Sequence, residues 1–261
     1  MFLKSFTNSH GTSLAARTIV VGTALATGVG LVGSVSAGVI YQDNFAGSAT
    51  TLLNGQAPQV ANGTSATWTA ASGAYNTTIY NADGSVTAGA AGGYANAFLA
   101  FTPSSGNIYT LSAGLNFNPS YSGWLMLGFL TSAANVNQSF IGAGGPWIAD
   151  TAGGGVYDGN TTGNFALTSG NGVAYDMQVV LDTRHTDWTV QFFNNNANVS
   201  PVLTYGTNPT ISYVGLGDSA SGGQFSNFSL TSAPVPEPAA LGLVAAASGL
   251  GLLLLKRRLR A

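Results

Sequence analysis

The 261-residue chain contains no cysteine, a single glutamate and few charged residues, which make up 6% of the sequence. The absence of cysteine excludes disulfide bonds, thiolate nucleophiles and cysteine-based metal sites. Retaining glycosidases of the β-sandwich type need two carboxylates about 5 Å apart, usually glutamates on one strand. The only glutamate is Glu237, close to the C-terminus. We therefore expect no enzyme activity of this class.

Positive charge is also scarce between the two ends of the chain. Residues 38–232 contain eight aspartates and, besides His185, one cation, Arg184, so this part carries a net charge near −7. A surface with a single arginine cannot neutralise a row of phosphates, so we expect no nucleic-acid partner. Solubility must then come from Asn, Ser, Thr and Gly, which are abundant.

The C-terminal stretch has three parts in a fixed order. A proline-glutamate-proline motif, which proline keeps out of regular helix, precedes an uncharged run over 239–255. As a helix this run is about 25 Å long, the short end of a bilayer span. Four cations follow, and because such cations stay in the cytoplasm, we expect the body of the protein on the other side of the membrane. The motif residues are Val235, Pro236, Glu237 and Pro238, and the cations are Lys256, Arg257, Arg258 and Arg260.

This order of parts resembles the PEP-CTERM sorting signal of exopolysaccharide-producing Gram-negative bacteria, over residues 233–261. The same region is sometimes labelled an ice-binding protein C-terminal domain, a label that implies nothing about ice. The resemblance implies recognition by the membrane protease exosortase and cleavage near the motif. Release to the cell surface or the extracellular matrix follows from that cleavage.

The N-terminal segment has the composition of a secretory signal peptide, expected over residues 1–37. An uncharged stretch over 19–35 ends in Val35-Ser36-Ala37, which supplies the small residue that signal peptidase needs. We expect export by the general secretion machinery and cleavage after Ala37; an uncleaved N-terminal anchor is the alternative. Either outcome exports a body over 38–232, which is long enough for one domain.

The body shows the period-two alternation of half-buried strands and no helical period. Apolar side chains alternate with polar ones from Tyr109 to Phe117, and Tyr175–Leu181 repeats the pattern. After a polar bend, Thr186–Phe193 should pair with the second of these strands as a hairpin. Further strands are expected over 39–45, 66–70, 95–101, 124–130, 202–205, 211–216 and 224–230. Turns are expected at the Asn-Gly or Asp-Gly pairs 54–55, 62–63, 83–84, 158–159 and 171–172.

So many short strands predict an all-β body of two packed sheets, a jelly-roll sandwich, between the signal peptide and a transmembrane helix. The first strand, which ends in Asp43-Asn44-Phe45, the hairpin and the closing segment 223–230 resemble a concanavalin A-like or laminin G-like domain. That resemblance implies a lectin, a glucanase or an adhesion module. The fold alone does not choose among them.

Few body residues are candidates for chemistry. The carboxylates beside the hairpin bend are better explained as partners of Arg184 in surface ion pairs than as catalytic groups. A candidate calcium cluster surrounds a glycine-rich segment, but its spacing matches no defined calcium loop, and ordinary turn residues are the alternative. No other cofactor is expected. The bend carboxylates are Asp182 and Asp187, and the calcium candidates are Asp150, Asp158 and Asn160.

The four tryptophans divide into two groups. Trp147 follows Gly144-Gly145-Pro146 on an expected loop, where its ring is a candidate platform for stacking on a sugar; packing beneath the loop is the alternative. Trp68, Trp124 and Trp188 lie in strand patterns and are expected in the core.

Two hypotheses from different classes stand. The preferred one is an exported, non-enzymatic surface or extracellular-matrix protein, which exosortase sorts and which is associated with exopolysaccharide or biofilm. Its partners are exosortase, signal peptidase, the membrane before processing, and polysaccharide. The rival is a secreted carbohydrate-active enzyme of the concanavalin A-like fold with the same sorting signal.

Overall fold

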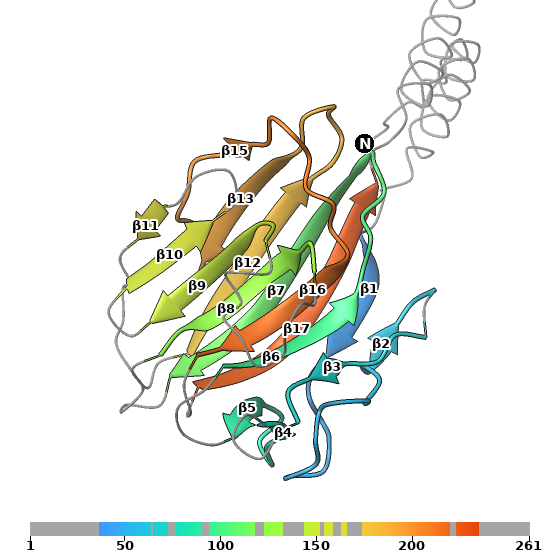
Figure 1. Cartoon of the computed structure of the whole chain (residues 1–261), viewed down its shortest axis with the longest axis vertical. Coiled ribbons are helices and arrows are strands. Elements are labelled where there is room, and N and C mark those ends of the chain that lie inside the picture. Colours follow the sequence, from blue (N-terminus) through green and yellow to red (C-terminus); the bar gives the residue numbers. More distant parts are fainter. Residues whose placement is uncertain are drawn as a thin grey trace, which may run out of the picture. The chain divides into compact units, whose positions relative to one another are not determined.

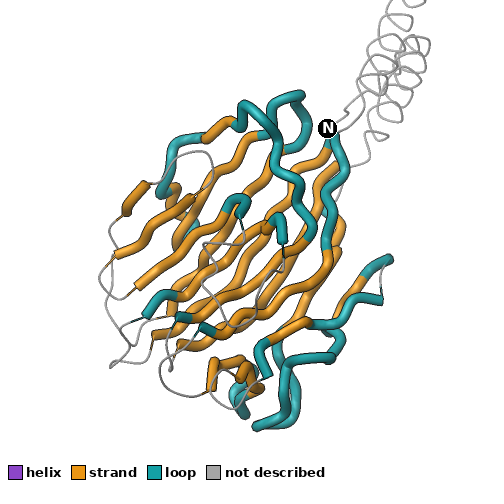
Figure 2. The backbone as a smooth tube through the Cα atoms, in the orientation of Figure 1, coloured by secondary structure: helices purple, strands orange, loops and turns teal. Residues whose placement is uncertain are grey.

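The computed structural model of the chain describes residues 37–63, 65–72, 77–89, 94–117, 123–132, 144–151, 154–158, 163–165, 174–219 and 223–234. These residues form strands, turns and loops (Figure 2). No helix within them has the length and hydrophobicity that crossing a bilayer requires. The motif at 235–238, the expected span over 239–255 and the signal segment up to residue 36 lie outside the described residues.

Two antiparallel sheets pack against each other (Figure 1). The first sheet contains β1 (Gly38–Asp43), β2 (Val60–Ala61), β4 (Thr77–Tyr80), β5 (Val86–Gly89), β7 (Asn107–Phe117), β12 (Ala174–Asp182), β13 (Thr189–Asn194), β14 (Ala197–Asn198), β15 (Leu203–Thr204) and β17 (Gly223–Pro234). The second sheet contains β3 (Thr69–Ala70), β6 (Ala95–Ala100), β8 (Leu125–Leu130), β9 (Trp147–Thr151), β10 (Gly154–Asp158), β11 (Gly163–Phe165) and β16 (Tyr213–Asp218).

In both sheets, several neighbouring strands come from parts of the chain that are far apart in sequence. The main path of the first sheet is β14-β13-β12-β7-β17-β1-β2, and that of the second is β11-β10-β9-β8-β16-β6-β3. The last two long strands therefore enter the centres of the two sheets: β16 lies between β8 and β6, and β17 lies between β7 and β1. The prediction of an all-β body with two packed sheets is confirmed, and the arrangement is consistent with a jelly roll.

The core lies between the sheets and follows the predicted alternation. On β7 the inward residues run from Tyr109 to Phe117 in steps of two, and all of them are buried. Leu125, Leu127 and Phe129 of β8 belong to the same apolar cluster from the opposite sheet. The predicted hairpin is also confirmed, because β12 pairs with β13 on either side of the bend.

Asp43 is a buried polar residue that the core accommodates with two hydrogen bonds. Its Oδ2 accepts from the Trp68 indole at 2.8 Å, and its Oδ1 accepts from the Phe45 amide at 2.8 Å. Burial raises the pKa of Asp43, while these two hydrogen bonds lower it. The Trp68 ring also meets Phe228 edge-on, with centroids 5.0 Å apart, as expected for a core tryptophan.

The second sheet is also buried on its outer face, which the sequence patterns did not predict. Trp147 is 3% exposed and forms a cluster there with Phe98 and Met126, among others. Glycines make room for the rings: a Cβ on Gly128 would lie 2.6 Å from the Cβ of Trp147, and one on Gly215 would lie 2.6 Å from the Phe98 ring. Central strands such as β8, buried at every residue, therefore carry apolar side chains on both faces.

Several predictions from the sequence need correction. The expected loop around Trp147 is strand β9, and the glycine-rich segment after it continues as β10, paired with β9. Trp124, expected in the core, is 36% exposed, because it precedes β8 on the face opposite Leu125. Trp188 is only partly buried and packs against the core edge. Short strands β2, β4, β5, β11 and β14 also escaped prediction.

Three of the predicted turns are confirmed by backbone geometry. Gly55, Gly63 and Gly84 adopt φ values of 82°, 80° and 77°, and each follows the Asn or Asp that the prediction paired with it. The other two turns, at 158–159 and 171–172, reach outside the described residues.

Candidate functional site

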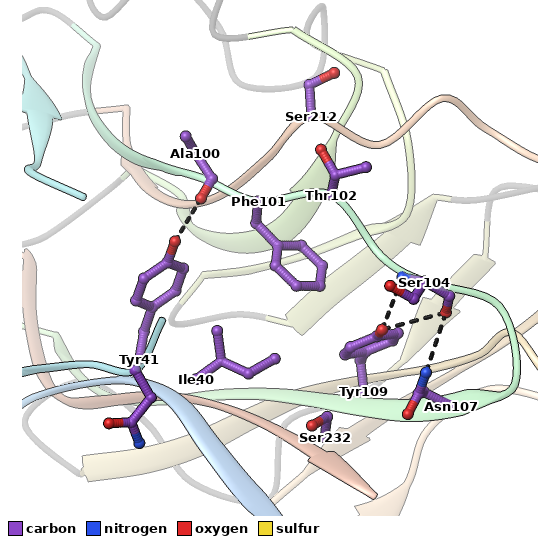
Figure 3. A pocket seen from close by; sticks show the side chains of 11 residues that line it. Ile40, Tyr41, Ala100, Phe101, Thr102, Ser104, Asn107, Tyr109, Ser212 and Ser232 are labelled. Carbon is purple, nitrogen blue, oxygen red and sulfur yellow. Dashed lines mark hydrogen bonds between the residues drawn. The ribbon is translucent and has the colours of Figure 1, made fainter. Parts of the chain in front are cut away.

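A pocket of about 530 Å³ opens where the two sheets meet near the start of β1 (Figure 3). This volume lies within the range of small-molecule sites, roughly 300–1,000 Å³. Five separate segments form it, and none of the eleven residues that line it is charged. The lining residues are Ile40, Tyr41, Asn62, Ala100, Phe101, Thr102, Ser104, Asn107, Tyr109, Ser212 and Ser232.

Three aromatic rings form the apolar part of the pocket. Tyr41, Tyr109 and Phe101 are 1%, 4% and 8% exposed, and the Phe101 and Tyr109 rings meet edge-on with centroids 5.1 Å apart. The Tyr41 hydroxyl donates to the Ala100 carbonyl at 2.6 Å, which joins β1 of the first sheet to β6 of the second. The Tyr109 hydroxyl accepts from the Ser104 amide at 2.8 Å. Backbone contacts therefore hold both tyrosine rings in place (Figure 3).

Four hydroxyls surround these rings. The hydroxyls of Thr102, Ser104, Ser212 and Ser232 make no hydrogen bond within the described part of the chain. Thr102 and Ser104 are exposed, and the two other serines are partly exposed. Each hydroxyl can donate one hydrogen bond and accept others, so the rim offers both functions to a ligand.

Two asparagines complete the rim. The Asn62 side-chain amide donates to the Val39 carbonyl at 2.7 Å, and that of Asn107 donates to the Ser105 carbonyl at 3.1 Å. Their side-chain carbonyl oxygens accept no hydrogen bond within the described residues. These oxygens are therefore fixed acceptors beside the free hydroxyls.

Thr183 positions the connection between β6 and β7 from outside the pocket. This residue is 1% exposed, and its hydroxyl lies 2.8 Å from the Ser104 carbonyl and 3.2 Å from the Asn107 amide. Its backbone amide also donates to the Asn107 carbonyl at 2.9 Å. Sequence reasoning missed this threonine, because a single threonine after a strand has no distinguishing pattern.

The two ends of the described chain lie beside the pocket. Gly38, the first residue of β1, pairs with Ser232 near the end of β17. Ser232 lines the pocket, and so does Ile40, two residues after the start of β1. Ala37, the residue before the expected signal cleavage, is exposed.

Asp150, a candidate calcium ligand, lies between the sheets. Asp150 is fully buried, and its Oδ2 accepts a hydrogen bond from the side-chain amide of Asn194 in the opposite sheet at 3.3 Å. Its Oδ1 has no hydrogen-bond partner among the described residues. The side-chain carbonyl oxygen of Asn194 is also buried without a partner. Burial raises the pKa of Asp150 to about 7.

Calcium binding stays a prediction. Asn160 and the side chain of Asp158 lie outside the described part of the structure. Within that part, no three His, Cys, Asp or Glu side chains come close enough to hold a metal ion together. Asp150 and Asn194 alone supply too few of the six to eight oxygens that Ca²⁺ requires.

The hairpin bend contains one of the expected ion pairs. Arg184 Nε donates to Asp182 at 2.8 Å, and this contact lowers the pKa of the Asp182 carboxyl. Asp187 is exposed and makes no ion pair with Arg184 in the structure. The pair lies at the surface and stabilises a turn, as expected from its spacing.

Trp147 does not contribute a sugar platform in this conformation, because its ring is buried in the outer cluster of the second sheet. Its indole nitrogen is buried and has no hydrogen-bond partner among the described residues. The free hydroxyls and amide carbonyls at the pocket rim are the better candidates for ligand contact. They come from segments that no single sequence pattern connects.

No protein-family model matches the chain, and no curated protein sequence matches it significantly. Among solved structures, it is similar to the carbohydrate recognition domain of Emp47p, with a TM-score of 0.49, 12% identity, and coverage of 77% of this chain and 97% of that one. It is also similar to an endo-1,3-beta-glucanase from Streptomyces sioyaensis, with a TM-score of 0.49, 11% identity, and coverage of 76% and 97%. A sialidase gives a TM-score of 0.46 and 14% identity over 62% of this chain, which spans only 16% of that protein.

Proposed function

We propose that this protein is an exported, non-enzymatic glycan-binding protein of the cell surface or extracellular matrix. The observation that carries the proposal is the uncharged pocket, with buried aromatic rings at its base. Its rim carries hydroxyls and side-chain carbonyl oxygens that have no hydrogen-bond partner among the described residues. A neutral sugar presents the matching groups, namely hydroxyls that donate and accept hydrogen bonds at the rim.

The absence of charge in the lining favours a neutral ligand. The residues that line the pocket include no carboxylate, histidine or cationic side chain. General acid–base catalysis uses such groups or a tyrosine hydroxyl, and the hydroxyls of both lining tyrosines are bonded to backbone groups. Binding without cleavage is therefore the activity that this lining supports best.

Sorting by exosortase is part of the same proposal. Its support is the motif at 235–238, the uncharged run over 239–255 and the cations after it. The sandwich begins at Gly38 and ends at Pro234, so the expected signal-peptidase and exosortase cleavages fall just outside its first and last strands. Processing at both positions would leave the sheets intact. The membrane anchor is then transient, and the mature protein associates with exopolysaccharide.

Filling the pocket tests the proposal. Ser212→Trp places a large ring in the pocket, while the backbone contacts of Ser212 with Phe101 and Leu130 stay available. We expect glycan-array binding to fall at least tenfold, because the ring occupies the space of a sugar. Val202→Trp is the matched control, since Val202 is 58% exposed and is not among the lining residues.

A reducing-sugar assay on the same glycans separates binding from hydrolysis. Release of reducing ends by the unmodified protein would support the rival enzyme hypothesis. Equal glycan binding by the Ser212→Trp and Val202→Trp variants would show that the pocket is not the site.

A further inference from the structure

A second row of residues on the molecule combines exposed aromatic rings with hydroxyls. Asp218 of β16 pairs with Ala95 of β6 and with Leu125 of β8, and Leu125 pairs in turn with Asp150 of β9. The residues next to these pairs, toward the same end of the sheet, are Tyr94, Ser219, Trp124 and Thr151. If the register continues by one position, these four residues form one row across four strands. The backbone confirms part of it: the Ser219 amide donates to the Trp124 carbonyl at 3.0 Å.

The row lies on the outer face of the second sheet. Leu125 and Asp150 are buried and point between the sheets, so their neighbours along the strands point the other way. Tyr94 is 37% exposed and Trp124 is 36% exposed, and they are two of the four large apolar side chains that are exposed in the described part of the chain. Deeper on the same face, Phe98, Met126 and Trp147 are buried. Tyr213 on this face is partly buried, so among the described residues the most exposed rings of the face are Tyr94 and Trp124.

The spacing of the row fits a polymer better than a single sugar. Neighbouring strands are about 4.8 Å apart, so Tyr94 and Trp124, two strands apart, are separated by roughly 10 Å. Ser219 lies between them and Thr151 lies beyond Trp124. Successive sugars in an extended polysaccharide are spaced at nearly the distance between neighbouring strands. Each residue of the row can therefore face one sugar, with aromatic side chains and hydroxyls in alternation.

The polar groups of the row are neutral and partly available. The Ser219 hydroxyl accepts from the Trp124 amide at 2.6 Å and keeps its own proton for another acceptor. The Thr151 hydroxyl donates to the Gly154 carbonyl at 2.9 Å. None of the four residues is charged. In a body of net charge near −7, such a row favours a neutral chain over an acidic one.

We propose that Tyr94, Ser219, Trp124 and Thr151 form a second binding surface, on which an extended neutral polysaccharide lies across the strands of the second sheet. The faces of alternate sugars stack on Tyr94 and Trp124, and the hydroxyls of Ser219 and Thr151 bind the sugars at the positions between and beyond them. This surface rests on the proposed glycan-binding function but shares no residue with the pocket. The pocket takes a short glycan, and the row takes a long chain.

Native-gel affinity electrophoresis tests the proposal on the protein as the host exports and processes it. The gels contain a long linear β-1,3-glucan, β-1,4-xylan or mannan, and parallel measurements use the matching disaccharides. Tyr94→Ala and Trp124→Ala should each weaken retardation by the retained polysaccharide about three- to tenfold, the loss expected for one stacking ring. Binding of the disaccharide should not change. Trp124→Phe should keep most of the affinity, because it keeps a ring.

Val202→Ala is the matched control, an exposed apolar side chain at another place on the surface. Its affinity should equal that of the unmodified protein, and thermal unfolding shows whether each variant is folded. The proposal is overturned if the alanine variants are retarded as strongly as the unmodified protein, or if Val202→Ala weakens binding equally. It is also overturned if Trp124→Ala only converts a dimer to a monomer, since the row would then be a self-association surface.

The two proposals fail separately. Loss of disaccharide binding in Ser212→Trp, with unchanged polysaccharide retardation in Tyr94→Ala and Trp124→Ala, would remove the second surface and keep the pocket. Reduced retardation in the alanine variants, with unchanged disaccharide binding in Ser212→Trp, would keep the surface and remove the pocket. Absence of binding to every neutral glycan would overturn both.

Discussion

Replacing Asp150 with asparagine should stabilise the protein at neutral and alkaline pH and have little effect in acid. Asp150 is fully buried, and one of its carboxyl oxygens accepts from the Asn194 amide at 3.3 Å. Burial raises its pKa more than the contact with the Thr151 backbone lowers it. No cation contacts it in the described structure. The charged form is therefore poorly solvated in the folded protein. An amide of the same shape removes that charge.

The size of the effect follows from the two pKa values. Burial raises the pKa of Asp150 from 3.8 to about 7 in the folded state. Between these values the unfolded chain has released its proton and the folded chain has not, so stability falls as pH rises. A difference of about three pKa units corresponds to roughly 4 kcal/mol. This is an upper value, because water that reaches the carboxylate reduces the loss.

Urea unfolding followed by tryptophan fluorescence measures this difference. The free energy of unfolding is compared between Asp150→Asn and the unmodified protein at pH 4, 5, 6, 7 and 8. Near pH 4 the two should agree within about 1 kcal/mol, since both side chains are neutral. The advantage of the variant should grow with pH and level off above about pH 7. Other carboxyls, such as Asp43, cancel in the comparison.

Asp187→Asn is the control, because it removes the same charge from an exposed position in the hairpin bend. Its effect on stability should be small, because the side chain is exposed. The reasoning is refuted if Asp150→Asn shifts stability equally at pH 4 and pH 8. A variant that is less stable than the unmodified protein at pH 8 would also refute it, because the carboxylate would then be solvated or paired when folded.

Two further predictions follow from other parts of the chain. Gly215→Ala should lower the free energy of unfolding by about 1–3 kcal/mol, because its Cβ would lie 2.7 Å from the Ala97 carbonyl oxygen and 2.6 Å from the Phe98 ring. Gly206→Ala is the control, because a Cβ at Gly206 would meet open space. Equal urea midpoints for the two variants would contradict the prediction. Replacing Lys256, Arg257, Arg258 and Arg260 with neutral residues should impair sorting, because these cations hold the end of the expected span in the cytoplasm; normal processing in fractionated cultures would show otherwise.

Strands with one buried face could be predicted from sequence because their alternation is visible. Tyr109–Phe117 and Tyr175–Leu181 carry it clearly, and both became long strands. The segment from Trp147 to Asp158 carries no alternation, since β9 is buried on both faces and β10 begins with two glycines. A strand that is covered on both sides reads as a short apolar run, which periodicity cannot separate from a loop.

The tryptophans show where local patterns fail. Trp124, expected in the core, is 36% exposed; Trp147, expected on a loop, lies in β9 and is 3% exposed, in line with the alternative that its ring is packed. Leu125, Leu127 and Phe129 occupy the inner face of β8, so the alternation places Trp124 on the outer face. Burial of Trp147 depends on an outer cluster from four strands. The pocket likewise joins distant segments, so only tertiary structure could reveal it.

The place of β17 in the first sheet has a mechanical consequence. Its C-terminal end pairs on one side with β1 and on the other with β7, and the ladder to β7 runs as far as Pro234. If the mature protein is attached through its C-terminus, tension pulls β17 along its own axis, and the hydrogen bonds of both ladders resist together. A strand at the edge of the sheet would instead peel away one hydrogen bond at a time. A glycan bound in the proposed pocket would pull from beside Ser232, so the force would pass through this end of the sandwich and leave most of the domain unstrained.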